Sequence, residues 1–367
     1  MRWGAWAAVR IVPLIILGIG GVGRALLRQM VACRSWHRAR FGLHLSVVAL
    51  ADSQGAAVEP KGLSDEALQA IEQLKAQGTP LAETPYGCHT ADAYAMVDIV
   101  GRDGTIVVDC TAAERVIPAL EMALERGYGV VLANKKPLTG PMTLFRRLTA
   151  SGRLRYETTV GAGTPIIAAL EGLLRGGDEV RRIVGALSGT LGFLMTQLEE
   201  GHSFSTSVRR AYEMKYTEPD PRDDLSGLDV ARKALILART LGWELELADV
   251  AVEPLFPPSL ASGTVEDFLT ELSALDADLA HRMQMACQTG QVLRYTAEIT
   301  DGHCVVGLHV VPKDSPLGRL RGSDNLAEFH TRWYTPEPLV LQGRGAGADA
   351  TAAGVLSDIV ALAQCMR

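Results

Sequence analysis

Five carboxylates are crowded into residues 216–233, which read YTEPDPRDDLSGLDVARK. Acids so close together repel one another unless a cation or a cationic ligand offsets them. A small substrate that carries an ammonium group would do so, and the stretch therefore predicts a substrate site. The five acids, which stand beside Arg222, Arg232 and Lys233, are Glu218, Asp220, Asp223, Asp224 and Asp229.

Asp229 and Lys233 lie four residues apart, so a helix places them on one face. An ordinary surface ion pair would explain that spacing. Ser226 and Asp229 also fit a capping box, which would give Asp229 a structural role as the third residue of a helix. Two observations argue against a purely structural role for this pair. The opposite face of the helix already supplies the apolar stripe for the core, and the loop before the pair is stiffened by prolines and carries further acids.

A glycine motif offers a second kind of chemistry. Gly18, Gly20 and Gly23 fit G-x-G-x-x-G, directly after an apolar run and at the start of a helical pattern, with Gly21 and Val22 inside the turn. The first glycine permits a tight turn, the second lets the backbone approach a pyrophosphate, and the third lets helix and strand pack closely. The helix N-terminus supplies N–H groups for the phosphates. This pattern predicts dinucleotide binding.

Two charged residues follow predicted strands near this motif. Asp52 stands where an acid accepts hydrogen bonds from the adenosine ribose and would favour NAD, but Asp52 and Ser53 are also typical of a turn. Lys135 follows the strand pattern VVLAN at the edge of the sheet where ligands bind, although a lysine pair also suits a solvated loop.

The surrounding pattern predicts how these residues are positioned. Strand-like and helix-like stretches alternate over the first 150 residues, which is typical of a Rossmann-type doubly wound parallel sheet. After residue 152 longer strand patterns predict a second α+β domain with an antiparallel or mixed sheet. The end reads as strand, glycine turn and helix, and we expect it to return to the first domain. The predicted domains are 1–150 with 338–367, and 151–337. The predicted strands are 11–17, 45–51, 105–111, 129–133, 292–299, 304–311 and 328–334, and the helices include 22–30, 65–77, 117–126 and 349–364.

Composition narrows the class of protein. The 367 residues are 47% hydrophobic with a net charge of −6 and no long basic run, which argues against nucleic acid as a partner. Six cysteines without a C-x-x-C pair suggest free thiols in a reducing compartment, and the histidines lack zinc-site spacing. The apolar run near the N-terminus is too short to span a bilayer. We expect a cytoplasmic protein.

Six segments together resemble the homoserine dehydrogenase family. They are GIGGVGR (18–24), ANKKPL (133–138), ETTVGAGTPII (157–167), SGTLGF (188–193), the acidic stretch (216–233) and GAGADATAAGVLSDI (345–359). The resemblance implies the reversible interconversion of L-aspartate 4-semialdehyde and L-homoserine with NAD or NADP, in threonine and methionine biosynthesis. It further implies that Glu218, Asp224 and Asp229 are the substrate carboxylates. Lys233 would face the reacting oxygen, with Asp229 keeping it charged, and Lys135 would be the second functional lysine.

The same resemblance implies further contacts. Thr111, Lys135 and Gly347 are expected to contact the dinucleotide. A monovalent cation, Na or K, is expected on main-chain oxygens of Glu157, Val160, Ala162 and Thr164, and a homodimer is expected through the second domain. Two residues depart from the family pattern: Lys215 stands where glycine is usual, and Arg344 where proline or alanine is commoner. The chain also stops just after the last predicted helix, so we expect neither a C-terminal regulatory module nor an aspartokinase portion.

Two other functions stay open at this point. Cys110, at the end of a predicted strand, would be the nucleophile of a thiol-dependent semialdehyde dehydrogenase, although no histidine lies near it in sequence. The fold would also serve a non-catalytic dinucleotide sensor.

Overall fold

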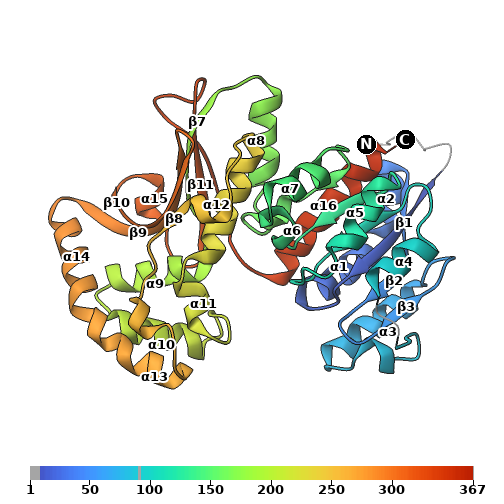
Figure 1. The fold of residues 1–367 in the computed structure, drawn as a ribbon, viewed down its shortest axis with the longest axis horizontal. Helices are drawn as coiled ribbons and strands as arrows, with labels where there is room; N and C mark the ends of the chain where they lie inside the picture. The colour runs from blue at the N-terminus through green and yellow to red at the C-terminus, as the bar shows by residue number, and fades with distance from the viewer. Residues whose placement is uncertain (1–8, 90–91, 367) are drawn as a thin grey trace. The chain divides into compact units, whose positions relative to one another are not determined.

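The computed structural model describes residues 9–89 and 92–366. Its packing divides the chain into two compact units, one made of Met1–Thr159 with Gly347–Arg367 and the other of Val160–Ala346. The first unit is therefore built from both ends of the chain (Figure 1).

The first unit contains a six-stranded sheet in the order β3-β2-β1-β4-β5-β6. All neighbouring strands are parallel except β2 and β3. The apolar run of β1 is buried over its last six residues, as expected for a parallel strand covered on both faces. This sheet confirms the predicted doubly wound fold. The strands are β1 (Arg10–Leu17), β2 (Leu43–Ala51), β3 (Ala56–Val58), β4 (Ile106–Asp109), β5 (Gly129–Leu132) and β6 (Leu154–Arg155).

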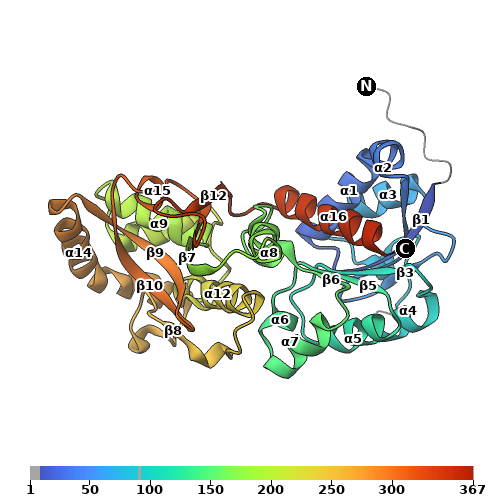
Figure 2. The same cartoon turned by 90° about the horizontal axis from the view of Figure 1, so that it is seen from above.

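Helices cover both faces of this sheet. Helices α1 and α16 lie together on one face, and α4 and α5 lie on the other (Figure 2). The basic segment after α1 forms the separate helix α2, whose last turn contains Arg38 and Arg40. The helices are α1 (Gly21–Ala32), α2 (Arg34–Phe41), α3 (Asp65–Ala76), α4 (Ala93–Val100), α5 (Ile117–Glu125), α6 (Lys136–Thr139), α7 (Met142–Thr149) and α16 (Ala348–Cys365), with 3₁₀ turns at Leu81–Glu83 and Glu157–Thr159.

The second unit contains a six-stranded sheet in the order β12-β11-β7-β9-β10-β8. Its strands pair antiparallel except β10 with β8, which confirms the expected mixed sheet. Residues 338–346 were predicted to belong to the first unit. Strand β12 instead pairs with β11, so this segment lies in the second unit. The strands are β7 (Val180–Ala186), β8 (Val250–Val252), β9 (Gln291–Thr300), β10 (His303–Pro312), β11 (Asp324–Thr331) and β12 (Leu339–Arg344).

Helices α9, α12 and α14 pack against strand β9. Among the described residues, no helix combines the length and the apolar character needed to cross a membrane. The helices of this unit are α8 (Ile166–Arg175), α9 (Gly189–Glu199), α10 (Phe204–Glu213), α11 (Pro221–Leu225), α12 (Leu228–Thr240), α13 (Val265–Glu271), α14 (Asp276–Gln288) and α15 (Pro316–Arg319), with 3₁₀ turns at Leu247–Asp249, Pro258–Leu260 and Leu272–Leu275.

Candidate active site

Lys233 is a buried lysine on α12, only 8% exposed. Its ammonium donates a hydrogen bond of 2.6 Å to the main-chain oxygen of Leu187, just past β7. It also forms an ion pair of 2.8 Å with Asp229, one helical turn earlier. An ammonium has three N–H donors, so two are fixed by the protein and a third is left for a ligand. Leu187 carries no sequence signal, because any residue type supplies a main-chain oxygen.

The start of α12 corrects the predicted capping box. The N-cap residue is Gly227, with φ of 74°, and the helix begins at Leu228 with no side-chain cap. Ser226 instead donates to the oxygen of Asp223 and accepts from the N–H of Leu228. A side chain at Gly227 would collide with the hydroxyl of Tyr295, so glycine is required there for two reasons. Asp229 is therefore not used as a cap and is left to pair with Lys233.

Asp224 lies beside this pair in an environment unfavourable for its charge. Burial raises the pKa of the Asp224 carboxyl, and the neighbouring carboxylates of Glu218 and Asp229 raise it further. Its carboxylate accepts a 2.7 Å hydrogen bond from the N–H of Glu218, and Thr190 also hydrogen-bonds to it. We call Glu218, Asp224, Asp229 and Lys233 the acidic site. Its three carboxyl groups and one ammonium give the acidic site a formal net charge of −2.

Thr190 joins the acidic site to α9. Its hydroxyl donates a 2.7 Å hydrogen bond to the main-chain oxygen of Tyr216. Thr190 stands at the start of α9, within the segment SGTLGF that carried part of the resemblance. No pattern in the sequence indicated its contact with Asp224, because the two residues meet only in the folded chain. Lys215, next to Tyr216, has φ of 57°, which confirms the left-handed conformation expected where glycine is usual.

Asp220 has a structural role. It caps α11 and forms an ion pair of 2.7 Å with Arg222, and that partner holds the pKa of the Asp220 carboxyl below its usual value. The guanidinium of Arg222 lies over the ring of Phe268 at 5.3 Å. Asp223 is exposed. The crowding of acids thus has two explanations: Asp220 shapes the loop, and Glu218, Asp224 and Asp229 belong to the acidic site.

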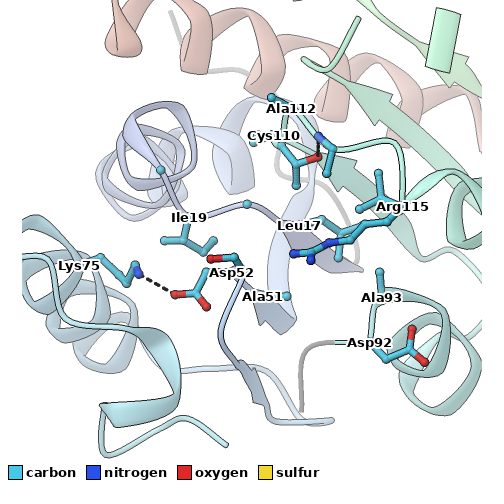
Figure 3. A pocket seen from close by; sticks show the side chains of 16 residues that line it. Leu17, Ile19, Ala51, Asp52, Lys75, Asp92, Ala93, Cys110, Ala112 and Arg115 are labelled. Atoms are coloured by element: carbon cyan, nitrogen blue, oxygen red, sulfur yellow. Dashed lines mark hydrogen bonds and ion pairs between the residues drawn. The ribbon is translucent and has the colours of Figure 1, made fainter. Parts of the chain in front are cut away.

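A cavity of about 700 Å³ opens at the carboxyl ends of β1, β2 and β4 in the first unit (Figure 3). We call it the glycine-turn cavity. Four of the predicted cofactor residues line it: Gly18, Gly20, Asp52 and Thr111. Gly18 has φ of 92°, and a side chain there would meet the backbone of Cys110 at 2.8 Å. An added Cβ at Gly20 meets no atom within 4 Å, so at Gly20 the backbone faces open space.

The other five predicted cofactor residues, Lys135 among them, do not line the cavity. A Cβ at Gly23 would collide with the oxygen of Gly18, so Gly23 serves close packing. Gly21 faces Ala348, at the start of α16, and Gly347 precedes that helix with φ of 126°. Val22 packs against the core of the first unit.

The two lysines after β5 differ in their surroundings. Lys135 is half-buried and is the N-cap residue of α6. Lys136 is half-buried as well, and it pairs with Glu114 at 3.7 Å. Asn134 fixes the backbone between them and β4: its amide donates to Asp109 at 3.0 Å and to the oxygen of Ala113 at 2.9 Å. Sequence reasoning missed Asn134, because its partners come from a different strand.

Asp52 forms the turn that one of its two readings predicted. Its carboxylate accepts hydrogen bonds from the N–H groups of Gln54, Gly55 and Leu81 at 2.8, 2.9 and 2.8 Å, and from Lys75 at 2.6 Å. Burial alone would raise the pKa of the Asp52 carboxyl, but these donors outweigh it and hold the pKa below its usual value. Asp52 is therefore ionised and tied to the protein at both oxygens.

Cys110 lies in the wall of the glycine-turn cavity. Burial raises the pKa of its thiol well above the usual range, and the nearby Asp109 raises it further. A nucleophilic cysteine needs the opposite shift, because the thiolate is the reactive form. The environment of Cys110 argues against the thiol-dependent alternative.

The predicted cation loop contains a strained backbone. Ala162 has φ of 53° and follows Gly161 with φ of 82°. Val160 and Thr164 are buried, and the oxygen of Thr164 accepts the N–H of Ile166. Glu157 begins the last 3₁₀ turn of the first unit. Across residues 9–89 and 92–366, no three histidine, cysteine or acidic side chains are grouped as metal ligands, so only main-chain oxygens are candidates.

Comparisons with known proteins add a family. A model described as homoserine dehydrogenase matches residues 165–360, and one described as the homoserine dehydrogenase NAD-binding domain matches residues 18–157. The bifunctional aspartokinase/homoserine dehydrogenase of Haemophilus influenzae is 38% identical over 96% of this chain, and the chain spans 43% of that protein. The homoserine dehydrogenase of Emericella nidulans is 36% identical, with 94% of this chain and 96% of that protein covered. A hyperthermophilic archaeal homoserine dehydrogenase, solved in complex with NADPH, is 25% identical with a TM-score of 0.75, covering 96% of this chain and 97% of that one.

Proposed function

The chain belongs to the homoserine dehydrogenase family, and from this we propose that it interconverts L-aspartate 4-semialdehyde and L-homoserine with a nicotinamide dinucleotide. The reaction is a step of threonine and methionine biosynthesis. The observation that carries the proposal is Lys233, a buried ammonium anchored at two of its three donors beside three acids. Few structural roles require a lysine in that setting, because burying an ammonium costs free energy unless it is paired.

Lys233 is proposed to act on the reacting oxygen of the substrate. The bound cofactor, when reduced, supplies a hydride to the aldehyde carbon. Negative charge then develops on the carbonyl oxygen, where a fixed N–H donor stabilises it and delivers the proton. In the oxidation direction the same nitrogen, as a neutral amine, accepts the hydroxyl proton. Asp229 and the Leu187 oxygen orient this side chain.

Glu218 and Asp224 are proposed to bind the ammonium group of the amino-acid substrate. Asp224 supports this role because its carboxyl is buried next to other acids, which is costly in the absence of a cation. A substrate ammonium would remove that cost. A substrate without the amino group would leave it in place, so the acidic site selects amino acids over simple alcohols.

The glycine-turn cavity is proposed to hold the dinucleotide. Its fit is supported by Gly20, whose backbone faces open space, and by α1, whose first turn provides N–H groups for a pyrophosphate. Gly18, Gly21, Val22 and Gly23 shape that turn. The loops that end in Thr111, Lys135 and Gly347 are proposed to flank the nicotinamide half, with Lys135 serving substrate as well.

A monovalent cation is proposed on main-chain oxygens of Glu157, Val160, Ala162 and Thr164. Support comes from Ala162, because a non-glycine residue in the left-handed region costs about 1 kcal/mol or more and such strain is concentrated at functional loops. We also propose a homodimer. The apolar side chain of Val305 is exposed on β10, and a second copy packed on that face of the sheet would cover it. A cytoplasmic location remains a prediction from the free thiols.

The test is a steady-state assay of homoserine oxidation, run with NAD and NADP in parallel and with or without added Na or K. We expect turnover with at least one dinucleotide and a higher rate with one cation. Tight dinucleotide binding without turnover in either direction would support a sensor instead. Phosphate-dependent turnover that Cys110→Ser abolishes would support the thiol-dependent alternative. Light scattering at several concentrations tests the dimer.

A further inference from the structure

The glycine-turn cavity is lined by four charged side chains at its adenosine end. They are Asp52, Lys75, Asp92 and Arg115 (Figure 3). An acid after the second strand ordinarily reads the ribose 2′-hydroxyl and repels a 2′-phosphate. Whether Asp52 does so here depends on what its oxygens already bind.

Asp52 has no acceptor capacity left for a ribose. An ionised carboxylate offers about four lone-pair positions. Asp52 fills them with the N–H groups of Gln54, Gly55 and Leu81 and with the ammonium of Lys75. Its charge is also balanced, because the Lys75 ion pair is 2.6 Å long and both side chains are nearly buried, 13% and 10% exposed. Asp52 therefore neither reads a hydroxyl nor presents a net negative charge.

Lys75 keeps free donors at this point. It stands in the last turn of α3 and lines the cavity, and its one hydrogen bond to Asp52 leaves two of its three N–H donors. Asp52 holds the ammonium in place. The pair is thus a fixed cation donor backed by an internal counter-ion.

Arg115 supplies a second cation from the opposite wall. It lies between β4 and α5, its guanidinium points into the cavity, and it is exposed (Figure 3). It forms no ion pair or side-chain hydrogen bond with any other residue that the structure describes. Asp92 caps α4 by accepting from the N–H of Tyr94 at 3.0 Å and forms no ion pair with Arg115. A guanidinium is well suited to a phosphate, which it binds through two parallel N–H groups.

We propose that this cavity selects a dinucleotide phosphorylated at the adenosine 2′ position, with Lys75 and Arg115 as the phosphate-binding side chains and Asp52 as the counter-ion of Lys75. The inference rests on the proposed function, since it assigns the cofactor of that reaction. A 2′-phosphate carries a charge of about −2 at neutral pH, which Arg115 offsets in part, while Lys75 contributes the two N–H donors that Asp52 does not use. A bare ribose would find donors but no acceptor at Asp52. The chain is therefore expected to prefer NADP over NAD despite an acid at the position that usually indicates NAD.

The experiment uses cofactor fragments, so that binding is read without turnover. Adenosine 2′,5′-bisphosphate and 5′-AMP are titrated into the full chain by calorimetry. We expect the bisphosphate to bind about 10-fold tighter or more, since a charge-assisted hydrogen bond is worth about 1.5–3 kcal/mol and 1.4 kcal/mol is tenfold. Lys75→Met and Arg115→Met should each weaken bisphosphate binding by about tenfold or more and leave AMP within about twofold.

Controls separate binding from folding. Lys61→Met removes an exposed lysine outside the cavity and should change neither titration. Lys75→Met removes the partner of Asp52 and is checked by thermal unfolding, whereas Arg115 is exposed and its variant should fold normally. AMP binding as tight as bisphosphate binding in the unmodified chain, or an unchanged ratio in Arg115→Met, would overturn the proposal. A normal ratio without homoserine oxidation would refute only the proposed reaction.

Discussion

Replacing Lys233 by methionine removes the ammonium of the acidic site while keeping most of the side-chain volume. If Lys233 donates to the oxygen that becomes charged, the loss equals that of one oxyanion-stabilising donor together with a general acid. Each is worth about 10²- to 10⁴-fold in rate, and because a single group serves both roles we expect kcat to fall by about 10²- to 10⁴-fold. Dinucleotide affinity should stay within about twofold, since Lys233 lies in the second unit and lines no part of the glycine-turn cavity.

The same substitution has a structural cost that must be measured separately. The main-chain oxygen of Leu187 loses its 2.6 Å partner, and an unsatisfied buried acceptor costs about 1–3 kcal/mol. Thermal unfolding of the variant gives that cost directly. Arg232→Met is the matched control, because Arg232 is the neighbouring residue on α12, is half-buried and has no ion pair among the described residues. It should retain kcat within about twofold. A folded Lys233→Met enzyme with near-normal kcat would refute the assigned role.

Three further predictions follow from the acidic site and the glycine turn. Glu218→Gln should raise KM for homoserine by about tenfold, the largest KM effect among the acids, with kcat little changed; an unaltered KM would remove that role. Because burial raises the pKa of Asp224, lowering the pH through that raised pKa protonates the carboxyl and weakens substrate binding, so KM for homoserine should rise on acidification and Asp224→Asn should flatten the profile. Gly23→Ala should lower the Tm through collision with Gly18, whereas Gly20→Ala should keep the Tm and weaken dinucleotide binding by about tenfold, as equilibrium titration would show.

The fold of the first unit was largely predictable, because its signal is local. A strand buried on both faces is a continuous apolar run, and β1, β2, β4 and β5 all show one bounded by turns or helical patterns. The C-terminal pattern misled for the same reason. Strand β12 followed by a glycine turn and α16 has the local appearance of a parallel unit, yet β12 pairs with β11 in the other sheet. Pairing partners are set by distant residues that local periodicity does not contain.

The charged side chains of the candidate site could be predicted from the sequence, but the groups that hold them in place could not. The crowding of acids pointed to Glu218, Asp224 and Asp229, because uncompensated charge is visible in a sequence. The partners that fix them are a main-chain oxygen at Leu187 and a hydroxyl at Thr190, and neither has a charge pattern. Asp52 shows the same limit. Its position indicated a ribose ligand, but its four donors come from a turn, from α3 and from the following 3₁₀ turn.

The division of the chain into units has a consequence for biosynthesis. Helix α16 packs along α1 and places Ala352, Val355 and Ile359 in the core of the first unit, although it is translated after the whole second unit. While the second unit emerges from the ribosome, the apolar surface that α16 later covers on the first sheet therefore stays exposed. Closure then joins residues more than 300 positions apart, as in the bond from Gln29 to Asp349. Such a nascent chain is a natural client for chaperones that shield exposed apolar surface until α16 has been translated.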